Sequence, residues 1–160
     1  MSTIFDQVFL FCTFLGNYSI IWILLAVILA FGNKKNASRI LSLSAVAIAS
    51  SFILTEMLKL TLRFPRPLIH SPYCPADYSF PSGHTATSFA AAFMLAQLDR
   101  KRAWLYMILA GLISYSRLYL GCHRPIDIAG GLIVAAVAYA ISLRFTKKNR
   151  STLAKQHKTH

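Results

Sequence analysis

Residues 80–98 read FPSGHTATSFAAAFMLAQL, and the fold is organised around this stretch. It opens with a polar turn that contains Ser82, Gly83 and His84, and it continues as an apolar run long enough for most of a membrane crossing. Such a turn at the start of a helix leaves backbone N–H groups unpaired at the positive end of the helix dipole, which makes an anion site. His84 adds a group that can carry a proton near neutral pH. The alternative interpretation is an ordinary capped helix with a surface histidine.

The composition of the chain indicates a membrane protein. Hydrophobic residues make up 56% of the 160 residues and charged residues 14%, and the apolar residues occur in long blocks. A net charge of +12 would indicate nucleic-acid binding in a soluble protein. Here most Lys and Arg lie in short segments between apolar blocks, and no RNA- or DNA-binding pattern accompanies them. We therefore expect the bilayer, and no nucleic acid, as a partner.

Five apolar segments predict an all-α fold, a polytopic membrane helix bundle with five transmembrane helices. Residues 3–15 are also apolar, but a helix of about a dozen residues cannot cross a hydrocarbon core of roughly 30 Å. We expect a short interfacial or half-membrane helix there. The predicted crossings are residues 18–31, 40–62, 84–98, 103–120 and 126–145.

Two further segments complete the predicted domain organisation. Residues 63–83 contain five of the six prolines, which predicts an ordered loop with little regular structure, the kind of segment in which functional residues tend to lie. Residues 146–160 are basic and polar, and we expect them to form a frayed tail. The chain thus divides into one membrane-embedded domain, residues 1–145, and the tail.

The distribution of basic residues predicts the orientation. Segments 32–39, 99–102 and 144–160 carry three, three and six Lys or Arg, and the alternation of crossings puts all three on one side. Segments 63–83 and 117–125 share the other side and carry four arginines. By the positive-inside rule the first side, with the tail, is cytoplasmic. The histidine-bearing loops then meet at the outer face, the periplasmic side of a bacterial inner (cytoplasmic) membrane.

Cationic side chains recur in three separated patterns on that outer face. The first is Lys59, six intervening residues and Arg66-Pro67, the second is the turn at 81–84, and the third lies within residues 116–127. Hydrolysis of a phosphate ester or anhydride needs cationic donors for the non-bridging oxygens, a nucleophile, and a proton for the departing oxygen. The candidate donors are the side chains of Lys59, Arg66 and Arg117 and the backbone N–H groups of Ser82 and Gly83.

Two histidines fill the other roles. Asp127 follows His123 by four positions at the entry to a helix. It can therefore accept a hydrogen bond from one ring nitrogen and leave the other nitrogen free to attack phosphorus. His84 is then the natural proton donor to the leaving group.

Together these patterns resemble the signature of the type 2 phosphatidic acid phosphatase superfamily, KxxxxxxRP, PSGH and SRxxxxxHxxxD, without a gap or substitution from residue 59 to residue 127. The resemblance implies a phosphohistidine intermediate on His123, oriented by Asp127, with His84 as acid and later as base toward water. It also implies that no metal ion or other cofactor takes part. The sequence agrees, because only Asp77 and Asp127 offer carboxylates on the outer side of the motif region. The family norm is six crossings.

Taken singly, several of these residues have simpler interpretations. Lys59 can extend from a helix end toward the interface, and Arg117 can anchor lipid headgroups. Asp127 near a helix start can stabilise the helix dipole. The joint occurrence of all three patterns, in order and on one membrane face, favours the catalytic interpretation.

The resemblance and the membrane location imply a lipid substrate with a phosphate or diphosphate headgroup. We expect undecaprenyl diphosphate, with phosphatidylglycerol phosphate, phosphatidic acid and lipid A as alternatives. Two other classes are a lipid phosphotransferase and a non-catalytic lipid-binding or transport subunit. The sequence leaves open the role of Glu56, a disulfide between Cys74 and Cys122, and the oligomeric state.

Overall fold

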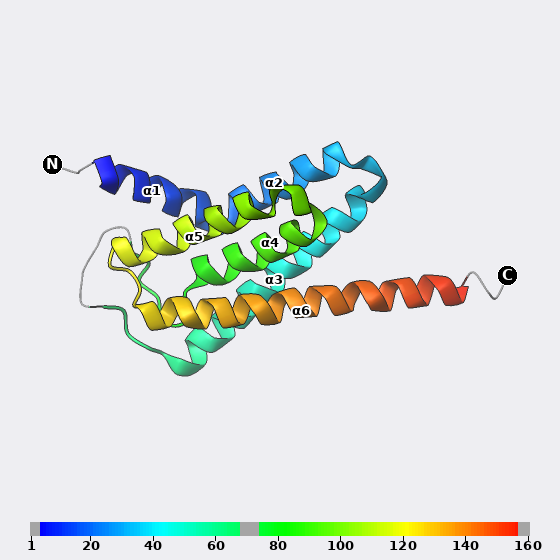
Figure 1. Ribbon diagram of the computed structural model, residues 1–160. Coiled ribbons are helices and arrows are strands. Elements are labelled where there is room, and N and C mark those ends of the chain that lie inside the picture. The colour runs from blue at the N-terminus through cyan, green and yellow to red at the C-terminus, as the bar shows by residue number, and fades with distance from the viewer. Residues whose placement is uncertain (1–3, 68–73, 157–160) are drawn as a thin grey trace.

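The computed structural model describes residues 4–67 and 74–156, and this part of the chain folds as a helix bundle (Figure 1). The predicted all-α fold is confirmed, since no strand occurs among the described residues. Three short 3-10 turns, Asn17–Ser19, Lys34–Asn36 and Arg100–Arg102, lie between helices. The helices are α1 (Ile4–Gly16), α2 (Ile20–Gly32), α3 (Ala37–Leu62), α4 (Gly83–Leu98), α5 (Ala103–Tyr119) and α6 (Pro125–Gln156).

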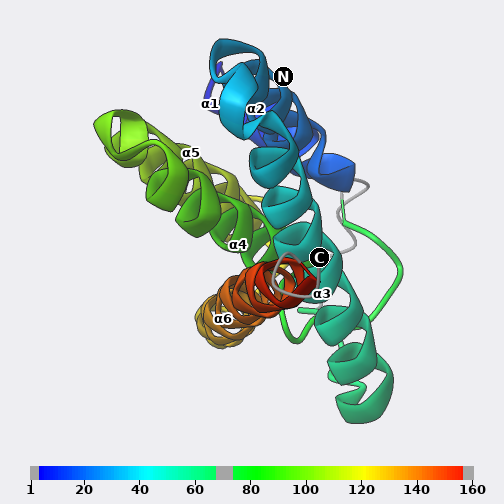
Figure 2. The same ribbon diagram turned by 90° about the vertical axis from the view of Figure 1, so that its right-hand side faces the viewer.

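Helix α4 is the centre of the bundle and packs against α3, α5 and α6 (Figures 1 and 2). Its sequence is rich in small residues, which let neighbouring helices approach closely in an apolar environment. Ala86, Ala90 and Ala92 are fully buried. On α6, an added Cβ at Gly131 would lie 2.8 Å from the carbonyl oxygen of Ser82, so a glycine is needed there. This packing fixes the N-terminal end of α4 against α6.

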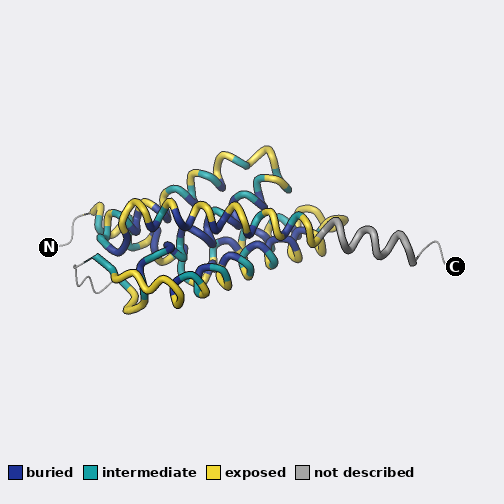
Figure 3. Tube along the Cα trace, turned by 90° about the horizontal axis from the view of Figure 1, so that it is seen from below, coloured by how far each residue is buried: buried dark blue, intermediate teal, exposed yellow. Residues whose placement is uncertain are grey.

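The surface of the bundle indicates an integral membrane protein. Buried residues face inward along each helix (Figure 3), while large apolar side chains such as Ile28, Phe52 and Ile133 are exposed. Helices α4 and α5, with 16 and 17 residues, are shorter than the 20 or so residues of an independent crossing, so the number of five crossings stays a prediction. The stretches long and apolar enough to cross are Ile4–Gly32, Lys34–Leu62 and Pro125–Phe145.

The N-terminal region differs from the expected pair of a short helix and a full crossing. Helices α1 and α2 have 13 residues each, about 20 Å at 1.5 Å per residue, so neither is long enough alone. They are joined through a break at Tyr18 and Ser19, whose φ angles are 51° and 57°. The short helix predicted within residues 3–15 is present, but residues 18–31 are a second short helix. Only the two together, Ile4–Gly32, have the length of a crossing.

The expected frayed tail is wrong for residues 146–156, which continue α6 as helix to Gln156. No glycine or proline follows Gly131 in this helix, and residues 144–156 contain three Lys and two Arg, which are good helix formers. Residues 157–160 of the predicted tail lie outside the described part of the chain. The division into domains at residue 145 stays a prediction.

The loop between α3 and α4 has no helix or strand in its described parts, residues 63–67 and 74–82, as predicted. Its two parts are held together where the N–H of Ser79 donates to the carbonyl oxygen of Phe64 at 2.9 Å. A disulfide joins Cys74 to Cys122, with their Cα atoms 5.3 Å apart, and ties the loop to the segment after α5.

Candidate active site

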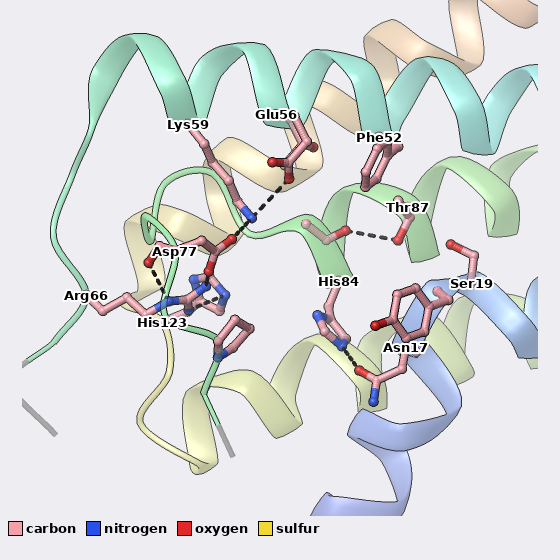
Figure 4. Close-up of a pocket in the computed structure, with 15 residues that line it drawn as sticks. Asn17, Ser19, Phe52, Glu56, Lys59, Arg66, Asp77, His84, Thr87 and His123 are labelled. Carbon is pink, nitrogen blue, oxygen red and sulfur yellow. Dashed lines mark hydrogen bonds and ion pairs between the residues drawn. The ribbon is translucent and has the colours of Figure 1, made fainter. Parts of the chain in front are cut away.

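A polar cavity of about 340 Å³ lies at the N-terminal end of α4 (Figure 4). Its walls come from the α1–α2 break, α3, the α3–α4 loop, α4 and the segment after α5. Five residues that the sequence predicted for the site line this one cavity: Lys59, Arg66, Gly83, His84 and His123.

His84 stands at the start of α4 and points toward the α1–α2 break (Figure 4). Its Nε2 lies 2.9 Å from Oδ1 of Asn17, an amide oxygen that can only accept, so Nε2 carries the hydrogen of this bond. The ring comes close to α1 because Gly16 has no side chain. A Cβ there would lie 2.9 Å from Cδ2 of His84 and 2.7 Å from Cγ2 of Ile113.

Asn17 is a site residue that the sequence reasoning missed. It contacts His84 across 67 positions of the chain, a contact that no local pattern encodes. The available signal is the Gly16-Asn17 pair, which separates the predicted short helix at residues 3–15 from the predicted crossing at 18–31. The N-terminal region thus contributes to the site as well as to the bundle.

His123 and Asp127 lie together as predicted, although their contact is loose. Nδ1 of His123 is 3.4 Å from Oδ2 of Asp127, a distance suited to a charge pair but long for a hydrogen bond. The same carboxylate oxygen accepts from the backbone N–H of Arg124 at 2.8 Å, the contact by which an acid in the first turn caps a helix. Nε2 of His123, the other ring nitrogen, lies 3.2 Å from Nη1 of Arg66.

The environment keeps His123 neutral. Burial lowers the pKa of His123 below its ordinary value of 6.5; Asp127 raises it, and the positive charges of Arg66 and Arg117 lower it further. A neutral imidazole is the form in which a ring nitrogen has a lone pair for attack.

Lys59 and Arg66 meet at a carboxylate that the sequence reasoning did not assign to the site (Figure 4). Lys59 Nζ and Arg66 Nη2 each donate to Asp77, one to each carboxylate oxygen. Lys59 also lies 3.2 Å from Oε1 of Glu56, so the open question of Glu56 is answered in part by this ion pair.

Arg117 does not line the cavity. Its side chain is 1% exposed, and Nη1 donates to Oγ1 of Thr13 on α1 at 3.3 Å. Its Nε and Nη2 have no hydrogen-bond partner among the described residues. Its backbone carbonyl accepts from the N–H groups of Cys122 and His123 at 3.0 and 3.2 Å and so holds the segment that carries His123. Phosphate binding by Arg117 stays a prediction.

The turn at residues 81–84 fulfils only part of its predicted role. The N–H of Ser82 donates to the carbonyl oxygen of Asp127 at 3.0 Å, and its Oγ caps α4 by accepting from the N–H of Thr85. The prediction that the Ser82 N–H is free for phosphate is therefore wrong in this arrangement, because the fold uses that donor to join α4 to α6. Gly83 lines the cavity close to Lys59, since a Cβ at Gly83 would lie 3.9 Å from Nζ.

An apolar groove of about 570 Å³ between α2 and α3 adjoins the polar cavity. The two share Tyr18, Ser19 and Phe52 in their walls. The rest of the groove is lined mainly by aliphatic residues: Ile23, Ala26, Leu41, Ser44, Ala45, Ile48 and Ala49. A polar site therefore continues into an apolar one along the membrane-spanning part of the molecule.

No cluster of three or more His, Cys, Asp or Glu suited to a metal ion occurs in residues 4–67 and 74–156. The independence from metal implied by the resemblance stays a prediction, which a chelator can test.

The fold and the site together define a class of protein, the membrane helix bundles in which two histidines and several cationic side chains surround one cavity. Residues 40–151 match the PAP2 superfamily, and the chain belongs to this family. It is 30% identical over 150 residues to undecaprenyl-diphosphatase BcrC of Bacillus subtilis, across 91% of this chain and 77% of that protein. It is 40% identical over 81 residues to the lipid A 4'-phosphatase of Bacteroides thetaiotaomicron, across 46% of this chain and 36% of that protein.

The fold is also that of a solved relative. The crystal structure of Aquifex aeolicus LpxE superimposes with a TM-score of 0.74 at 28% identity, across 90% of this chain and 88% of that chain. Family and relatives identify a phosphatase that acts on lipid-like substrates.

Proposed function

We propose that this protein hydrolyses the phosphate or diphosphate monoester headgroup of a lipid through a phosphohistidine intermediate on His123. The observation that carries the proposal is the single cavity lined by His84, His123, Lys59 and Arg66. Two imidazoles and two cations supply the nucleophile, the acid and the charge stabilisation that displacement at phosphorus needs.

In the first step Nε2 of His123 attacks phosphorus, and the bond between phosphorus and the leaving oxygen breaks. The leaving oxygen takes a proton from His84, whose ring is oriented by Asn17. Asp127 stabilises the positive charge that develops on the imidazole of His123 from its position 3.4 Å from Nδ1. Lys59 and Arg66 neutralise the non-bridging oxygens.

In the second step water attacks the phosphohistidine while His84, now neutral, takes the proton from that water. The bond between phosphorus and Nε2 breaks, inorganic phosphate leaves, and both histidines return to their starting states. No metal ion is needed in either step, since the protein's own cations hold the phosphoryl oxygens.

We propose undecaprenyl diphosphate as the substrate, with undecaprenyl phosphate as the leaving group. The likeness to the Bacillus subtilis relative over 91% of the chain supports this choice. A polyisoprenoid tail also fits the apolar groove between α2 and α3, which begins where the polar cavity ends. The basic segments at one end of the bundle support a site on the extracytoplasmic side of the inner membrane, with the tail of residues 146–160 in the cytoplasm.

Phosphatidylglycerol phosphate, phosphatidic acid and lipid A are alternative substrates, because each offers a phosphate on an apolar anchor. A lipid phosphotransferase would share the first step and replace water by a lipid hydroxyl. A non-catalytic binding or transport subunit would need the cations alone, and the pair of histidines in the cavity argues against it.

The test is release of inorganic phosphate by the purified protein in detergent, in the presence of a chelator, with a panel of these lipid phosphates. We expect hydrolysis of undecaprenyl diphosphate at the highest kcat/KM and a stoichiometric loss of its terminal phosphate. A transferase would release phosphate only slowly without an acceptor lipid. A binding subunit would release none.

The residue assignments are tested in the same assay. His123→Ala and His84→Ala are expected to be inactive, and full activity in His123→Ala would rule out the mechanism. Arg66→Gln is expected to raise KM. Arg63→Gln is its matched control, because Arg63 lies on the same loop, is exposed, and within the described residues its side chain donates to the carbonyl oxygen of Leu60.

A further inference from the structure

Asp77 occupies the place where a phosphate group would meet the cations of the site. Its two carboxylate oxygens each accept from one cation, Oδ2 from Lys59 and Oδ1 from Arg66. A carboxylate that bridges a lysine and an arginine makes the same kind of charge-assisted contact that two oxygens of a phosphate would make.

The contacts leave Arg66 little capacity for a second anion. Its Nε donates to the carbonyl oxygen of Asp77 at 2.9 Å, and Nη1 donates to the carbonyl oxygen of Cys122 at 2.9 Å. Nη2 is used by the Asp77 carboxylate. Arginine binds phosphate best through two parallel N–H donors, and here the edge that offers Nε and Nη2 faces Asp77. Departure of the carboxylate therefore frees Nη2 for a phosphate oxygen, while Nε stays bonded to the backbone carbonyl oxygen of Asp77.

Arg66 in this position also covers the nucleophile. Its Nη1 lies 3.2 Å from Nε2 of His123, the nitrogen that the proposed mechanism uses for attack. With Nδ1 directed to Asp127, the lone pair of Nε2 faces this N–H donor. The lone pair becomes available only when Nη1 moves off it.

The carboxylate of Asp77 has room to move. Its side chain is 38% exposed, whereas those of Lys59 and Arg66 are 9% and 13% exposed. The backbone around it is held by the disulfide at Cys74 and by the hydrogen bonds of Ser79. Displacement therefore requires rotation of one side chain and leaves the loop in place. Although burial opposes ionisation, hydrogen bonds from Lys59 and Arg66 lower the pKa of Asp77, so it is an anion at neutral pH.

We propose that Asp77 is an internal anion whose carboxylate occupies the phosphate-binding cations Lys59 and Arg66 in the resting protein until the phosphate of the substrate displaces it. This proposal rests on the proposed function and deepens it. A phosphate monoester carries about two negative charges at neutral pH and displaces a carboxylate of one charge, whereas neutral or singly charged groups do so poorly.

The test is the affinity for inorganic phosphate, measured by isothermal titration of the full-length protein in detergent at fixed pH and ionic strength. Asp77→Asn removes the competing charge and keeps the size of the side chain. We expect phosphate to bind this variant at least about tenfold more tightly than wild type, with a lower KM for lipid substrate and stronger product inhibition. Unchanged or weaker phosphate binding by Asp77→Asn would overturn the proposal. If Asp77 only positioned Lys59 and Arg66, its loss would weaken phosphate binding.

Two further variants distinguish competition between Asp77 and phosphate from the general effect of removing a negative charge near the site. Glu56→Gln also removes one negative charge beside Lys59, but the ion pair of Glu56 in the described part of the chain is with Lys59 and not with Arg66, so its effect is expected to be several-fold smaller. An equal gain in both variants would overturn the specific role of Asp77. Asp77→Glu keeps the charge and should bind phosphate about as weakly as wild type. A gain like that of Asp77→Asn would contradict displacement.

The wild-type protein provides a test that needs no variant. A structure with inorganic phosphate bound at Lys59 and Arg66 should have the Asp77 carboxylate turned away from both. Phosphate bound while the carboxylate still bridges both cations would refute the proposal. If no lipid phosphate is hydrolysed but the affinities follow the expected order, the proposed function fails while the anion exchange stands.

Discussion

Gly16→Ala tests whether α1 positions His84, the proposed proton donor. The added Cβ would lie 2.9 Å from Cδ2 of His84 and 2.7 Å from Cγ2 of Ile113, where carbon atoms prefer about 3.5–4.0 Å. His84 or α1 must therefore move by roughly 0.5–1 Å. A displacement of about 1 Å in a catalytic group can lower the rate by around 100-fold, so we expect kcat to fall about 10- to 100-fold.

The matched control is Gly32→Ala, since Gly32 ends α2 as Gly16 ends α1 and an added Cβ would have no neighbour within 4 Å. It should keep the wild-type kcat and gain up to about 1 kcal/mol from helix propensity. Overpacking at Gly16 costs about 1–3 kcal/mol and should lower the melting temperature in detergent. The assay is phosphate release at saturating lipid substrate. A Gly16→Ala protein with the wild-type kcat would show that α1 does not hold His84.

Three further predictions concern pH, the disulfide and the groove. Because the pKa of His123 is lowered, its neutral form persists below pH 6.5, and kcat/KM should stay constant as the pH falls through 6.5. A fall in kcat/KM on the acid side with a midpoint above pH 6.5 would contradict the burial argument. Replacing both Cys74 and Cys122 by Ser should lower the free energy of unfolding, measured by thermal unfolding. The loss should be less than the roughly 4 kcal/mol that the chain-entropy model gives for a loop of this length. The reason is that helices embedded in the membrane keep the two cysteine positions at one face even when helix packing is lost. Insensitivity of the wild-type melting temperature to reductant would count against the bridge. Ala45→Trp should fill the groove and lower kcat/KM about tenfold for a long-chain lipid phosphate, while a short-chain water-soluble analogue is hydrolysed as before. Equal losses for both substrates would exclude the groove as the tail site.

The convergence of distant motifs could be predicted because hydropathy, charge bias and motif chemistry all agreed. Apolar blocks placed Lys59, His84 and His123 near helix ends on one side, and the cavity lined by all three is what that placement requires. Helix starts were also accessible, since Ser82 is a typical N-cap residue and Pro125 a typical first helical residue.

The contacts that were missed depend on the tertiary structure. Asn17 lies between the predicted segments 3–15 and 18–31, where nothing local indicates a contact with a histidine 67 positions away. Asp77 was considered only as a possible metal ligand, and its pairing with Lys59 and Arg66 requires the loop to fold back over α3. The N–H of Ser82 was assigned to phosphate because a helix start offers free donors, and the approach of α6 supplies a competing acceptor in Asp127.

The length of α6 has a mechanical consequence. Its 32 residues measure about 48 Å, but the apolar part, Pro125–Phe145, has only 21 residues, about 31 Å. The remaining residues of α6 extend as helix for about 16 Å beyond this apolar part, and their sequence includes Lys147, Lys148, Arg150 and Lys155. A helical extension of that length is long enough to reach through the lipid headgroup layer.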